Sequence, residues 1–353
     1  ERARGGIGRG PIMKAVVMKA YGGPEMMDLV DIAAPQITVR DVKVKVYAAS
    51  INPIDYKIRS GQFKQVLKYH LPTPMGFDVA GVVTETGMRA THFNEGDRVY
   101  AYVQPGRIGT LAEQIAIERT DVAPMPKSLS FEEAAAVPLV ALTAWQALVD
   151  YFKLKAGQSI LIHAGAGGVG TFAIQFAKHL GATVTTTASA PKHALLKELG
   201  ADECIDYTST DFTQGRPRFD AVFDTVGGKN LLDSFKVVKP GGTVVSIVSL
   251  PDEPTARRFG LGWFPRAVLR FLNRKTLAAA RAANANYRFL SAQPAEAQLR
   301  RITELIDAGK VRPVIDSVFP LEQFREAFAK LEAGHATGKI VVRVREDEPA
   351  ATE

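Results

Sequence analysis

The chain has 353 residues, of which 46% are hydrophobic and 23% are charged. This composition is typical of a globular protein with cores for about two domains. No apolar run approaches the roughly 20 residues that a membrane-spanning helix needs. The single cysteine, Cys204, excludes an intramolecular disulfide and a zinc site of four cysteines. The formal charge is +7; because the basic residues are scattered and aromatic residues are few, a phosphorylated ligand is the simplest explanation.

The N-terminal residues 1–12 are basic and Gly-rich, begin without Met, and lack the apolar segment of a signal peptide. We expect them to be a remnant of recombinant expression or a disordered arm. The acidic residues 346–353, EDEPAATE, are expected to be a disordered tail. A lone cysteine is compatible with a reducing compartment, so a cytoplasmic location is expected.

The first third of the chain has a strand-like pattern. Short apolar or alternating runs separated by Gly, Pro or Asp predict a barrel or sandwich; they lie at 14–20, 41–50, 78–87, 97–103 and 111–117. The Ala-rich residues 130–152 then predict a helix with Ser130 as its N-cap.

From Ser159 onward, apolar strands alternate with helices. Strands are predicted at 159–164, 183–188, 220–227 and 243–249, with helices at 168–180, 191–199 and 229–238. This alternation is typical of a doubly wound parallel sheet. A strand at 287–290, a helix at about 295–308 and a strand at 340–345 complete the pattern.

A glycine-rich loop follows the first strand of this second region. HAGAGGVG (163–170) places Gly165, Gly167 and Gly170 in the spacing G-x-G-x-x-G between an apolar strand and a helix. Glycine allows the turn and a close approach of a pyrophosphate, and the helix N-terminus supplies N–H donors. We expect this loop, including Gly168 and Val169, to bind a dinucleotide. The alternative is a tight turn without a ligand.

The next strand indicates which dinucleotide. An NAD site usually has Asp or Glu after this strand, at the ribose 2′-hydroxyl. Residues 188–192 read ASAPK, with no acid. The hydroxyl of Ser189 and the ammonium of Lys192 suit a 2′-phosphate, so NADP(H) is expected. Alternatively, Lys192 is an ordinary lysine in the first turn of a helix.

Together these motifs resemble the medium-chain dehydrogenase/reductase superfamily and, within it, the zinc-independent quinone oxidoreductase and enone (2-alkenal) reductase branch. The resemblance covers about Met13 to Val344; its motifs include NPIDYKIRSG (52–61), GFDVAGVV (76–83), GDRVYAY (96–102), LTAWQAL (142–148), ILIHAGAGGVGTFAIQFAKHLGA (160–182), FDTVGG (223–228) and GKIVV (338–342). It implies an α/β fold with a GroES-like β-barrel catalytic domain (13–135 and 293–345) and a Rossmann NADP-binding domain with a doubly wound parallel sheet (136–292). It also implies a homodimer, formed by pairing Rossmann edge strands.

The resemblance also implies roles for individual residues. Asn52 would lie beside the nicotinamide, and Thr143 near the neighbouring phosphate and ribose. Lys192 and Tyr207 would contact the 2′-phosphate end. The remaining cofactor contacts would come from two strand ends, with Val226, Val248 and Ser249, and from Lys339 near the catalytic residues.

Zinc-dependent members of the superfamily use a cysteine in the first loop and a Gly-His-Glu motif. This chain has Asn52-Pro53-Ile54-Asp55 and Gly76-Phe77-Asp78 at those places, so no metal site is expected. Without a Lewis acid to ionise an alcohol, hydride addition to a quinone or an α,β-unsaturated carbonyl is favoured.

The segment INPIDYKIRSGQF (51–63) is the predicted reactive segment. Quinone reductases of the branch often have tyrosines where this chain has Lys57 and Phe63, and the pattern is more similar to alkenal and enone reductases. We expect Lys57 to polarise the substrate carbonyl or to donate a proton, with Tyr56 as a weaker acid candidate and Phe63 beside the substrate. Alternatively, Lys57 faces solvent and water protonates the product. Asp55 and Arg59 are expected to pair with each other or with the backbone.

Residues 251–286 are long for a connection between Rossmann strands. Leu261, Phe264, Val268 and Leu272 recur at helical spacing, and Arg266, Arg270 and Arg274 every four residues. This predicts a basic amphipathic helix that packs on the domain. The alternatives are a lid whose Trp263 and Phe264 close over an apolar substrate, or a membrane-surface contact.

The sequence therefore predicts an NADPH-dependent, zinc-free oxidoreductase that transfers hydride to quinones or α,β-unsaturated carbonyls, more narrowly to enones or alkenals. The alternative is a non-enzymatic NADPH-binding protein, crystallin-like or RNA-binding. Because the chain lacks a concentrated basic-aromatic patch of the kind that stacks on RNA, no nucleic acid is expected.

Overall fold

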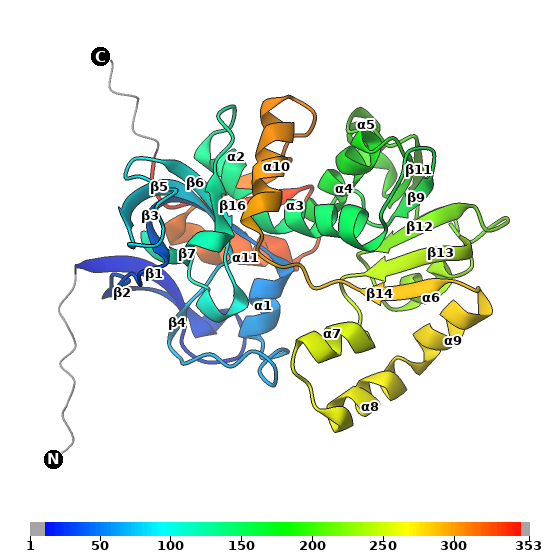
Figure 1. The fold of residues 1–353 in the computed structure, drawn as a ribbon, viewed down its shortest axis with the longest axis horizontal. Coiled ribbons are helices and arrows are strands. Elements are labelled where there is room, and N and C mark those ends of the chain that lie inside the picture. Colours follow the sequence, from blue (N-terminus) through cyan, green and yellow to red (C-terminus); the bar gives the residue numbers. More distant parts are fainter. Residues whose placement is uncertain (1–10, 347–353) are drawn as a thin grey trace. The chain divides into compact units, whose positions relative to one another are not determined.

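The computed structural model describes residues 11–346 and divides into two compact units (Figure 1). Unit 1 comprises the chain up to Leu139, Pro294–Asp307 and the chain from Ile315. Unit 2 comprises Val140–Gln293 and Ala308–Val314. The expected arm and tail lie outside the described residues except at residues 11, 12 and 346. Ile12 begins a strand, so the arm does not extend to residue 12.

Unit 1 contains two mainly antiparallel sheets. The larger has the order β15-β16-β3-β5-β6-β8, and β7 pairs with β3 outside this path. Only the β15–β16 pair in it is parallel. The smaller sheet has the order β2-β1-β4. The strands are β1 (Ile12–Met18), β2 (Met27–Ala33), β3 (Asp41–Ile51), β4 (Thr73–Pro74), β5 (Asp78–Thr86), β6 (Arg98–Tyr102), β7 (Gln114–Glu118), β8 (Val122–Pro124), β15 (Ile315–Pro320) and β16 (Lys339–Arg343).

Four α-helices of unit 1 are α1 (Pro53–Arg59), α2 (Phe131–Ala135), α10 (Glu296–Asp307) and α11 (Phe324–Glu332); the 3-10 turns are Pro24–Met26, Pro105–Arg107, Arg119–Asp121 and Leu321–Gln323. α11 packs on β15, β16 and α1, and α10 packs on β8. Tyr100 of β6 fixes α10 by donating to the carbonyl of Leu299 at 2.9 Å.

The single helix predicted over 130–152 is wrong. The chain forms α2, then α3 (Pro138–Trp145), then a π-helical segment (Gln146–Tyr151). Pro138 has no N–H to continue a preceding helix, so a new helix begins there. Ser130 is the N-cap as predicted: its hydroxyl accepts from the N–H of Glu133 at 3.2 Å, and the Glu133 carboxylate accepts from the N–H of Ser130 at 2.9 Å.

Unit 2 has one parallel six-stranded sheet in the order β11-β10-β9-β12-β13-β14. The order reverses between β9 and β12, as in a doubly wound dinucleotide-binding fold. The strands are β9 (Ser159–Ile162), β10 (Thr183–Ala188), β11 (Glu203–Asp206), β12 (Phe219–Asp224), β13 (Val238–Ser246) and β14 (Asn286–Phe289).

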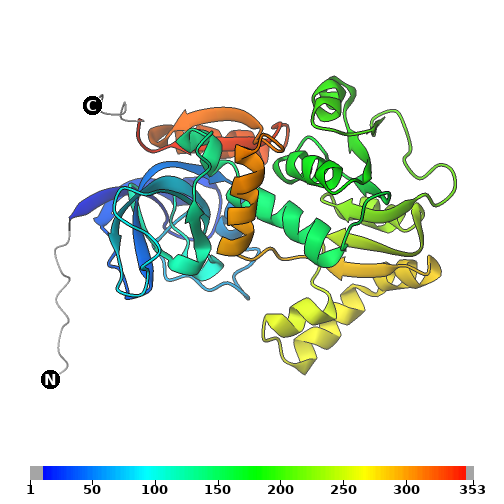
Figure 2. The ribbon, with the colours of Figure 1, turned by 45° about the horizontal axis from the view of Figure 1, so that its top comes forward.

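Helices cover both faces of this sheet (Figures 1 and 2). α4 (Gly168–His179) contacts β9 and β10, and α5 (His193–Glu198), which follows the 3-10 turn Ala190–Lys192, contacts β11. On the other face, α6 (Lys229–Ser234) and α9 (Arg274–Ala282) form a buried core with the sheet. That core includes Leu161, Val222 and Val244 of the strands, Leu231 of α6 and Ala280 of α9.

Two parts of unit 2 differ from expectation. Residues 251–286 contain three helices, α7 (Glu253–Arg258), α8 (Trp263–Leu272) and α9. Residues 308–314, assigned above to the catalytic domain, cluster with unit 2. Two hydrogen bonds join this segment to α4: the Gln175 side chain donates to the carbonyl of Arg312 and accepts from its N–H, both at 2.9 Å.

Candidate functional site

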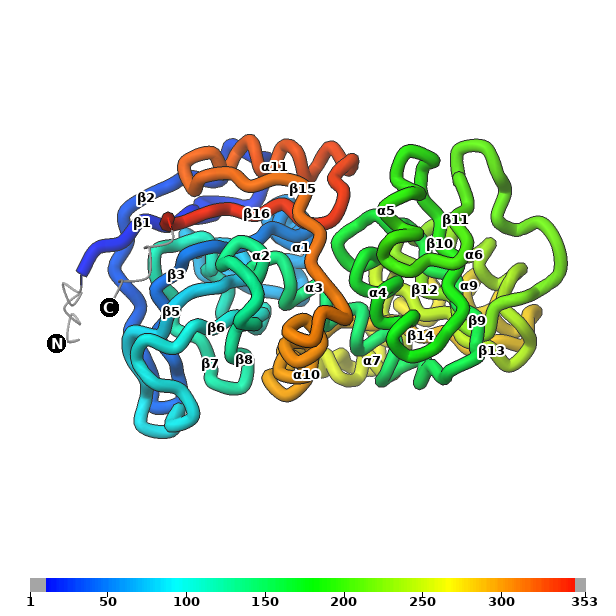
Figure 3. The backbone as a smooth tube through the Cα atoms, turned by 90° about the horizontal axis from the view of Figure 1, so that it is seen from above, coloured from blue at the N-terminus to red at the C-terminus, as the bar shows by residue number. Residues whose placement is uncertain are grey.

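Three strand ends of unit 1 converge on one point. Ser50, near the end of β3, pairs with Asp78 at the start of β5, and Ile51 pairs with Ile340 near the start of β16. Asn52 follows β3 directly, and Lys339 is the first residue of β16. The register therefore brings Asn52, Asp78 and Lys339 together, although they are far apart in the chain (Figure 3 traces the three strands).

These polar side chains are buried and hydrogen-bond one another. Asp78 accepts from the Asn52 amide at 2.8 Å, from the Ser50 hydroxyl at 3.0 Å and from the N–H of Leu139 at 2.7 Å. The Lys339 ammonium donates to the Asn52 side-chain oxygen at 2.5 Å and to the carbonyl of Ile51 at 2.9 Å, and lies 3.4 Å from Asp78. We call these residues, with Asp55, the buried polar cluster.

Burial lowers the pKa of Lys339, while the charges of Asp78 and Asp55 oppose this effect. The ammonium lies among three oxygen acceptors at the place where the resemblance puts the zinc ligands of other members. Among the residues that the structure describes, no group of three or more His, Cys, Asp or Glu side chains is arranged to hold a metal ion.

Asp55 has an incomplete set of partners. One carboxylate oxygen accepts from the N–H of Asn52 at 2.7 Å, which caps α1. The other is buried and has no hydrogen-bond partner in the described part of the chain. Desolvation by burial raises the pKa of Asp55 to about 7, although the Asn52 N–H and the charge of Lys339 work in the other direction. Asp55 is therefore a carboxyl group that exchanges a proton near neutral pH.

Asp55 and Arg59 do not pair with each other. Asp55 pairs with the backbone, which was one of the two expectations. Arg59 is also buried and forms a bidentate ion pair with Glu332 of α11, at 2.8 and 3.0 Å. This pair fixes α1 against α11.

Lys57 and Tyr56 lie on the same helix, and both are partly buried, as is Phe63 just beyond it. Within the described residues, the Lys57 ammonium makes no hydrogen bond or ion pair, whereas the Lys57 carbonyl accepts from the Ser60 hydroxyl at 2.9 Å. Its ammonium is thus available to a ligand, and its catalytic role stays a prediction.

The predicted glycine loop of unit 2 connects β9 to the N-terminus of α4. A Cβ at Gly165 would lie 2.0 Å from the Thr186 hydroxyl of β10, and a Cβ at Gly170 would lie 2.5 Å from the carbonyl of Ala164. Packing therefore requires glycine at these two positions. The first N–H groups of α4, at Gly168, Val169 and Gly170, have no acceptor within the helix.

Gly167 is different. It is the N-cap of α4 with φ −76° and ψ 169°, a conformation open to any residue. A Cβ here would come no closer than 3.4 Å to any neighbour, an ordinary contact. Neither packing nor backbone conformation explains this glycine, whereas the close approach of a phosphate would.

The other predicted cofactor residues of unit 2 gather at the same edge of the sheet. Because the strands are parallel, their carboxyl ends share one edge. Ser189 and Lys192 follow β10, and Tyr207 follows β11; further along the edge, Val226 follows β12, and Val248 and Ser249 follow β13. Tyr207, Val226 and Val248 are exposed there. Thr143 is buried on α3, which packs on α4 through an edge contact of Trp145 with Phe176.

Two groups that the sequence did not single out shape this edge. Asp224 is buried and accepts from the Ser246 hydroxyl at 2.7 Å and the N–H of Gly227 at 2.9 Å, which fixes the turn after β12. His163 is also buried, 3.2 Å from the hydroxyls of Thr187 and Ser234. Burial lowers the pKa of His163 to about 4, so the ring is neutral at pH 7. Its role is to hold the neighbouring hydroxyls in place.

The predicted cofactor residues Asn52 and Lys339 belong to the buried polar cluster of unit 1. They are only 1% and 4% exposed, and their polar atoms bond within the cluster. The structure thus shows what holds them in place, and their contact with a cofactor stays a prediction.

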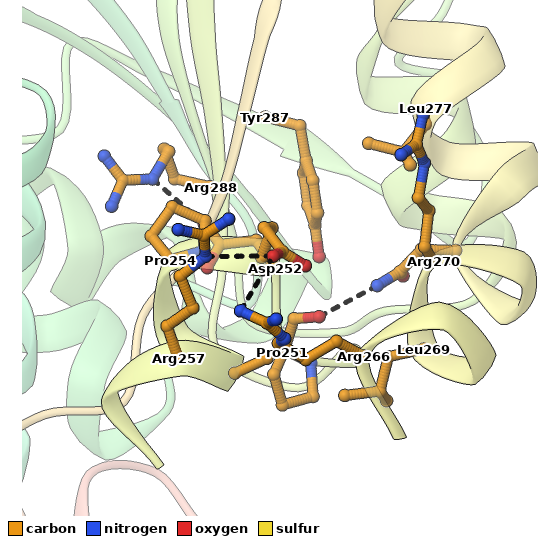
Figure 4. Close-up of a pocket in the computed structure, with 13 residues that line it drawn as sticks. Pro251, Asp252, Pro254, Arg257, Arg266, Leu269, Arg270, Leu277, Tyr287 and Arg288 are labelled. Atoms are coloured by element: carbon orange, nitrogen blue, oxygen red, sulfur yellow. Dashed lines mark hydrogen bonds and ion pairs between the residues drawn. The ribbon is translucent and has the colours of Figure 1, made fainter. Parts of the chain in front are cut away.

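A pocket of about 400 Å³ lies elsewhere in unit 2, lined by α7, α8 and β14 (Figure 4). Its wall includes Arg266, Leu269 and Arg270 of α8 and Tyr287 and Arg288 of β14. The predicted substrate residues Trp263 and Phe264 are not among its lining residues. They lie on another face of α8, 75% and 62% exposed.

Comparison with known proteins gives matches over nearly the whole chain. Two family models match, one described as "Alcohol dehydrogenase GroES-like domain" over residues 39–127 and one as "Zinc-binding dehydrogenase" over residues 199–342. The NADPH-dependent alkenal/one oxidoreductase of Arabidopsis thaliana is 38% identical over 342 residues, which cover 94% of this chain and 79% of the relative. The mitochondrial NAD(P)H oxidoreductase RTN4IP1 of Danio rerio is 36% identical over 365 residues, with coverage of 96% and 93%.

Among solved structures, the quinone oxidoreductase from Coxiella burnetii is similar, with a TM-score of 0.83 and 36% identity. The match covers 95% of this chain and all of that one. Over the described residues, no helix has the length and apolar character needed to cross a membrane.

Proposed function

The chain belongs to the medium-chain dehydrogenase/reductase superfamily, in the branch of quinone oxidoreductases and enone reductases, and from this we propose that it is an NADPH-dependent reductase of conjugated carbonyl compounds. The relatives named above support an oxidoreductase that uses NADP(H). The expected GroES-like and doubly wound fold is confirmed. Within the broader class of quinones and α,β-unsaturated carbonyls, we propose enones or alkenals as the preferred acceptors.

The observation that carries the cofactor assignment is Gly167. Its conformation and surroundings permit a side chain, so the absence of one is explained by a pyrophosphate resting on the N-terminus of α4. Ser189, Lys192 and Tyr207, at the ends of the neighbouring strands, would hold the 2′-phosphate. Val226, Val248 and Ser249 would contact the rest of the cofactor along the same edge.

The chemistry that NADPH would supply when bound is a hydride for the β-carbon of the acceptor, and negative charge would then develop on the carbonyl oxygen. Lys57 is partly buried, and its ammonium has no partner among residues 11–346. This ammonium would hydrogen-bond the carbonyl oxygen and stabilise the enolate. The buried polar cluster holds the start of α1 in place through the Asp55 cap, and so positions Lys57. The enolate then takes a proton at the α-carbon, from Lys57, Tyr56 or water.

The experiment that tests the cofactor assignment compares three proteins in NADPH titrations and thermal melts. Gly167→Ala should weaken NADPH binding about tenfold, because the new methyl group obstructs the phosphate, while the melting temperature is unchanged. Gly106→Ala, where a Cβ would meet nothing, is the matched control and should change neither quantity. Full-affinity NADPH binding by a well-folded Gly167→Ala variant would refute the assignment.

The acceptor class is tested with steady-state rates for a panel of quinones, enals and enones. Lys57→Met should lower kcat/KM for an enone about 100-fold, because the donor to the developing oxyanion is lost. Lys64→Met, an exposed lysine on the same stretch of chain, is the control. Unchanged enone turnover by Lys57→Met would eliminate the proposed role of Lys57.

We further propose a homodimer, supported by the position of β14 at the edge of the sheet of unit 2, and a cytoplasmic location. Light scattering of the purified chain tests the homodimer, since a mass of one chain would contradict it. Fractionation of the source cells tests the cytoplasmic location.

A further inference from the structure

α8 exposes large apolar side chains along its whole length. Trp263, Phe264, Phe271, Leu272 and Val268 are between 42% and 75% exposed, and the helix has no buried residue. Trp263 and Phe264 meet edge to face, with ring centroids 5.8 Å apart. Exposed apolar residues scattered singly are ordinary, but five on one helix form a patch of the kind that marks an interaction surface.

In a usual surface helix the apolar side faces the protein, whereas in α8 the apolar side faces outward. At about 100° per residue, the five apolar side chains share one side, whereas Arg266, Leu269 and Asn273 lie on the other. The side of Arg266, Leu269 and Asn273 faces the pocket, and the Asn273 amide donates to the carbonyl of Pro251 at 3.0 Å. A mainly polar side thus attaches α8 to unit 2, and an apolar side faces outward.

The patch lies in a strongly basic segment. Residues 254–286 contain seven basic residues and no acidic residue. Arg270, Arg274 and Lys275 are exposed at or just beyond α8. Within the described residues, Arg270 and Lys275 form no ion pair, although Arg270 also lines the pocket. Arg274 stacks on the Phe271 ring at 4.2 Å. The cations beside the patch are therefore available to an external anion.

We propose that the apolar side of α8 docks on an anionic phospholipid bilayer as a peripheral interfacial helix. Trp and Phe would lie at the boundary between headgroups and acyl chains, while the long Arg and Lys side chains reach lipid phosphates. A second copy of the chain is the weaker candidate, because a two-fold contact through this face would place like charges opposite each other. This proposal is independent of the proposed catalytic function.

Co-sedimentation of the full chain with vesicles tests it. Wild type should bind vesicles containing phosphatidylglycerol, bind pure phosphatidylcholine vesicles weakly, and lose binding as salt is raised. Phe264→Ser/Phe271→Ser should weaken anionic-vesicle binding by about tenfold or more. Arg270→Gln/Lys275→Gln should weaken it roughly tenfold.

Two control variants remove similar groups elsewhere. Val66→Ser/Met88→Ser removes two exposed apolar side chains, and Lys127→Gln/Lys310→Gln removes two exposed lysines; both should bind like wild type. Trp263 fluorescence should shift to the blue with anionic vesicles, and Trp263→Phe should abolish the shift. Thermal melts verify that each variant is folded.

Three results would overturn the proposal. The first is wild-type vesicle binding by Phe264→Ser/Phe271→Ser. The second is a fall of this variant to a lower oligomeric mass, which would make the patch an interface between copies. The third is a Phe264→Ser/Phe271→Ser variant that still binds vesicles but has a raised KM for a water-soluble enone, which would make α8 a lid.

Discussion

α1 and α8 are short helices in which polarity and burial do not follow the usual rule. In α1, Asp55 and Arg59 are charged residue types, yet they are only 1% and 3% exposed. In α8, Trp263 and Phe264 are aromatic, yet they are mostly exposed. The comparison shows that available partners decide which side chains are buried. In α1, a backbone N–H binds Asp55 and Glu332 binds Arg59. On its inner side, α8 has the ion pair of Arg266 with Glu253 and a hydrogen bond from Asn273, just beyond the helix.

Within the two helices, the largest loss of stability at neutral pH is expected from breaking the ion pair of α1. Arg59→Ala should lower the free energy of unfolding by about 2–4 kcal/mol, because the buried arginine loses a bidentate contact and Glu332 is left without its partner. Urea unfolding with a fixed m-value measures this change.

The control for Arg59 is an exposed ion pair of the same unit. Arg325→Ala removes the contact with Asp28, in which both side chains are well exposed, and should cost less than about 1 kcal/mol. Equal losses for the two variants would show that burial does not set the strength of the Arg59 pair.

The second prediction concerns pH. Asp55 has a raised pKa of about 7 in the folded chain against 3.8 in the unfolded chain, so between these values only the folded state holds the proton. Its contribution to stability is therefore lost as pH rises through this window, by up to about 1.4 kcal/mol per pH unit. Asp55→Asn should flatten this dependence in unfolding experiments at several pH values. If the free energy of unfolding of Asp55→Asn still falls with pH as in the wild type, another titratable group causes this dependence.

The smallest effect is expected in α8. Phe264→Ser/Phe271→Ser removes two aromatic rings but should change the free energy of unfolding by about 0.5 kcal/mol or less, because both are already exposed. Phe176→Ser, in the fully buried core of α4, should unfold or severely destabilise the chain and provides the contrast. A loss of several kcal/mol in the α8 variant would mean that its apolar side packs on the protein.

The local sequence pattern was sufficient to predict many of the strands and helices. The period of two in β3 and β5, the apolar runs of β9 and β12 and the glycine loop before α4 were all visible in the sequence. β11 (ECID) and β15 (IDSVFP) were missed because short strands with polar residues resemble loops. They are strands because they pair in parallel with β10 and β16.

The site divides in the same way. In unit 2, Ser189 and Lys192 could be placed from the pattern because they follow the recognisable strand β10. Tyr207 was placed by the family resemblance alone, since it follows the missed strand β11. The buried polar cluster could not be located, since Asn52 meets Asp78 and Lys339 across 26 and 287 residues of chain. The only local signal was the spacing of Asn52 and Asp55, which is that of a capping pair. For α8, periodicity predicted the amphipathic helix but could not show which side faces outward.

The most direct test of the proposed function is the rate of NADPH oxidation with an α,β-unsaturated ketone as the sole acceptor, together with identification of the product. We expect turnover that is faster with NADPH than with NADH, and a saturated ketone as product. Tight NADPH binding without turnover of any enone, enal or quinone would contradict the proposed function.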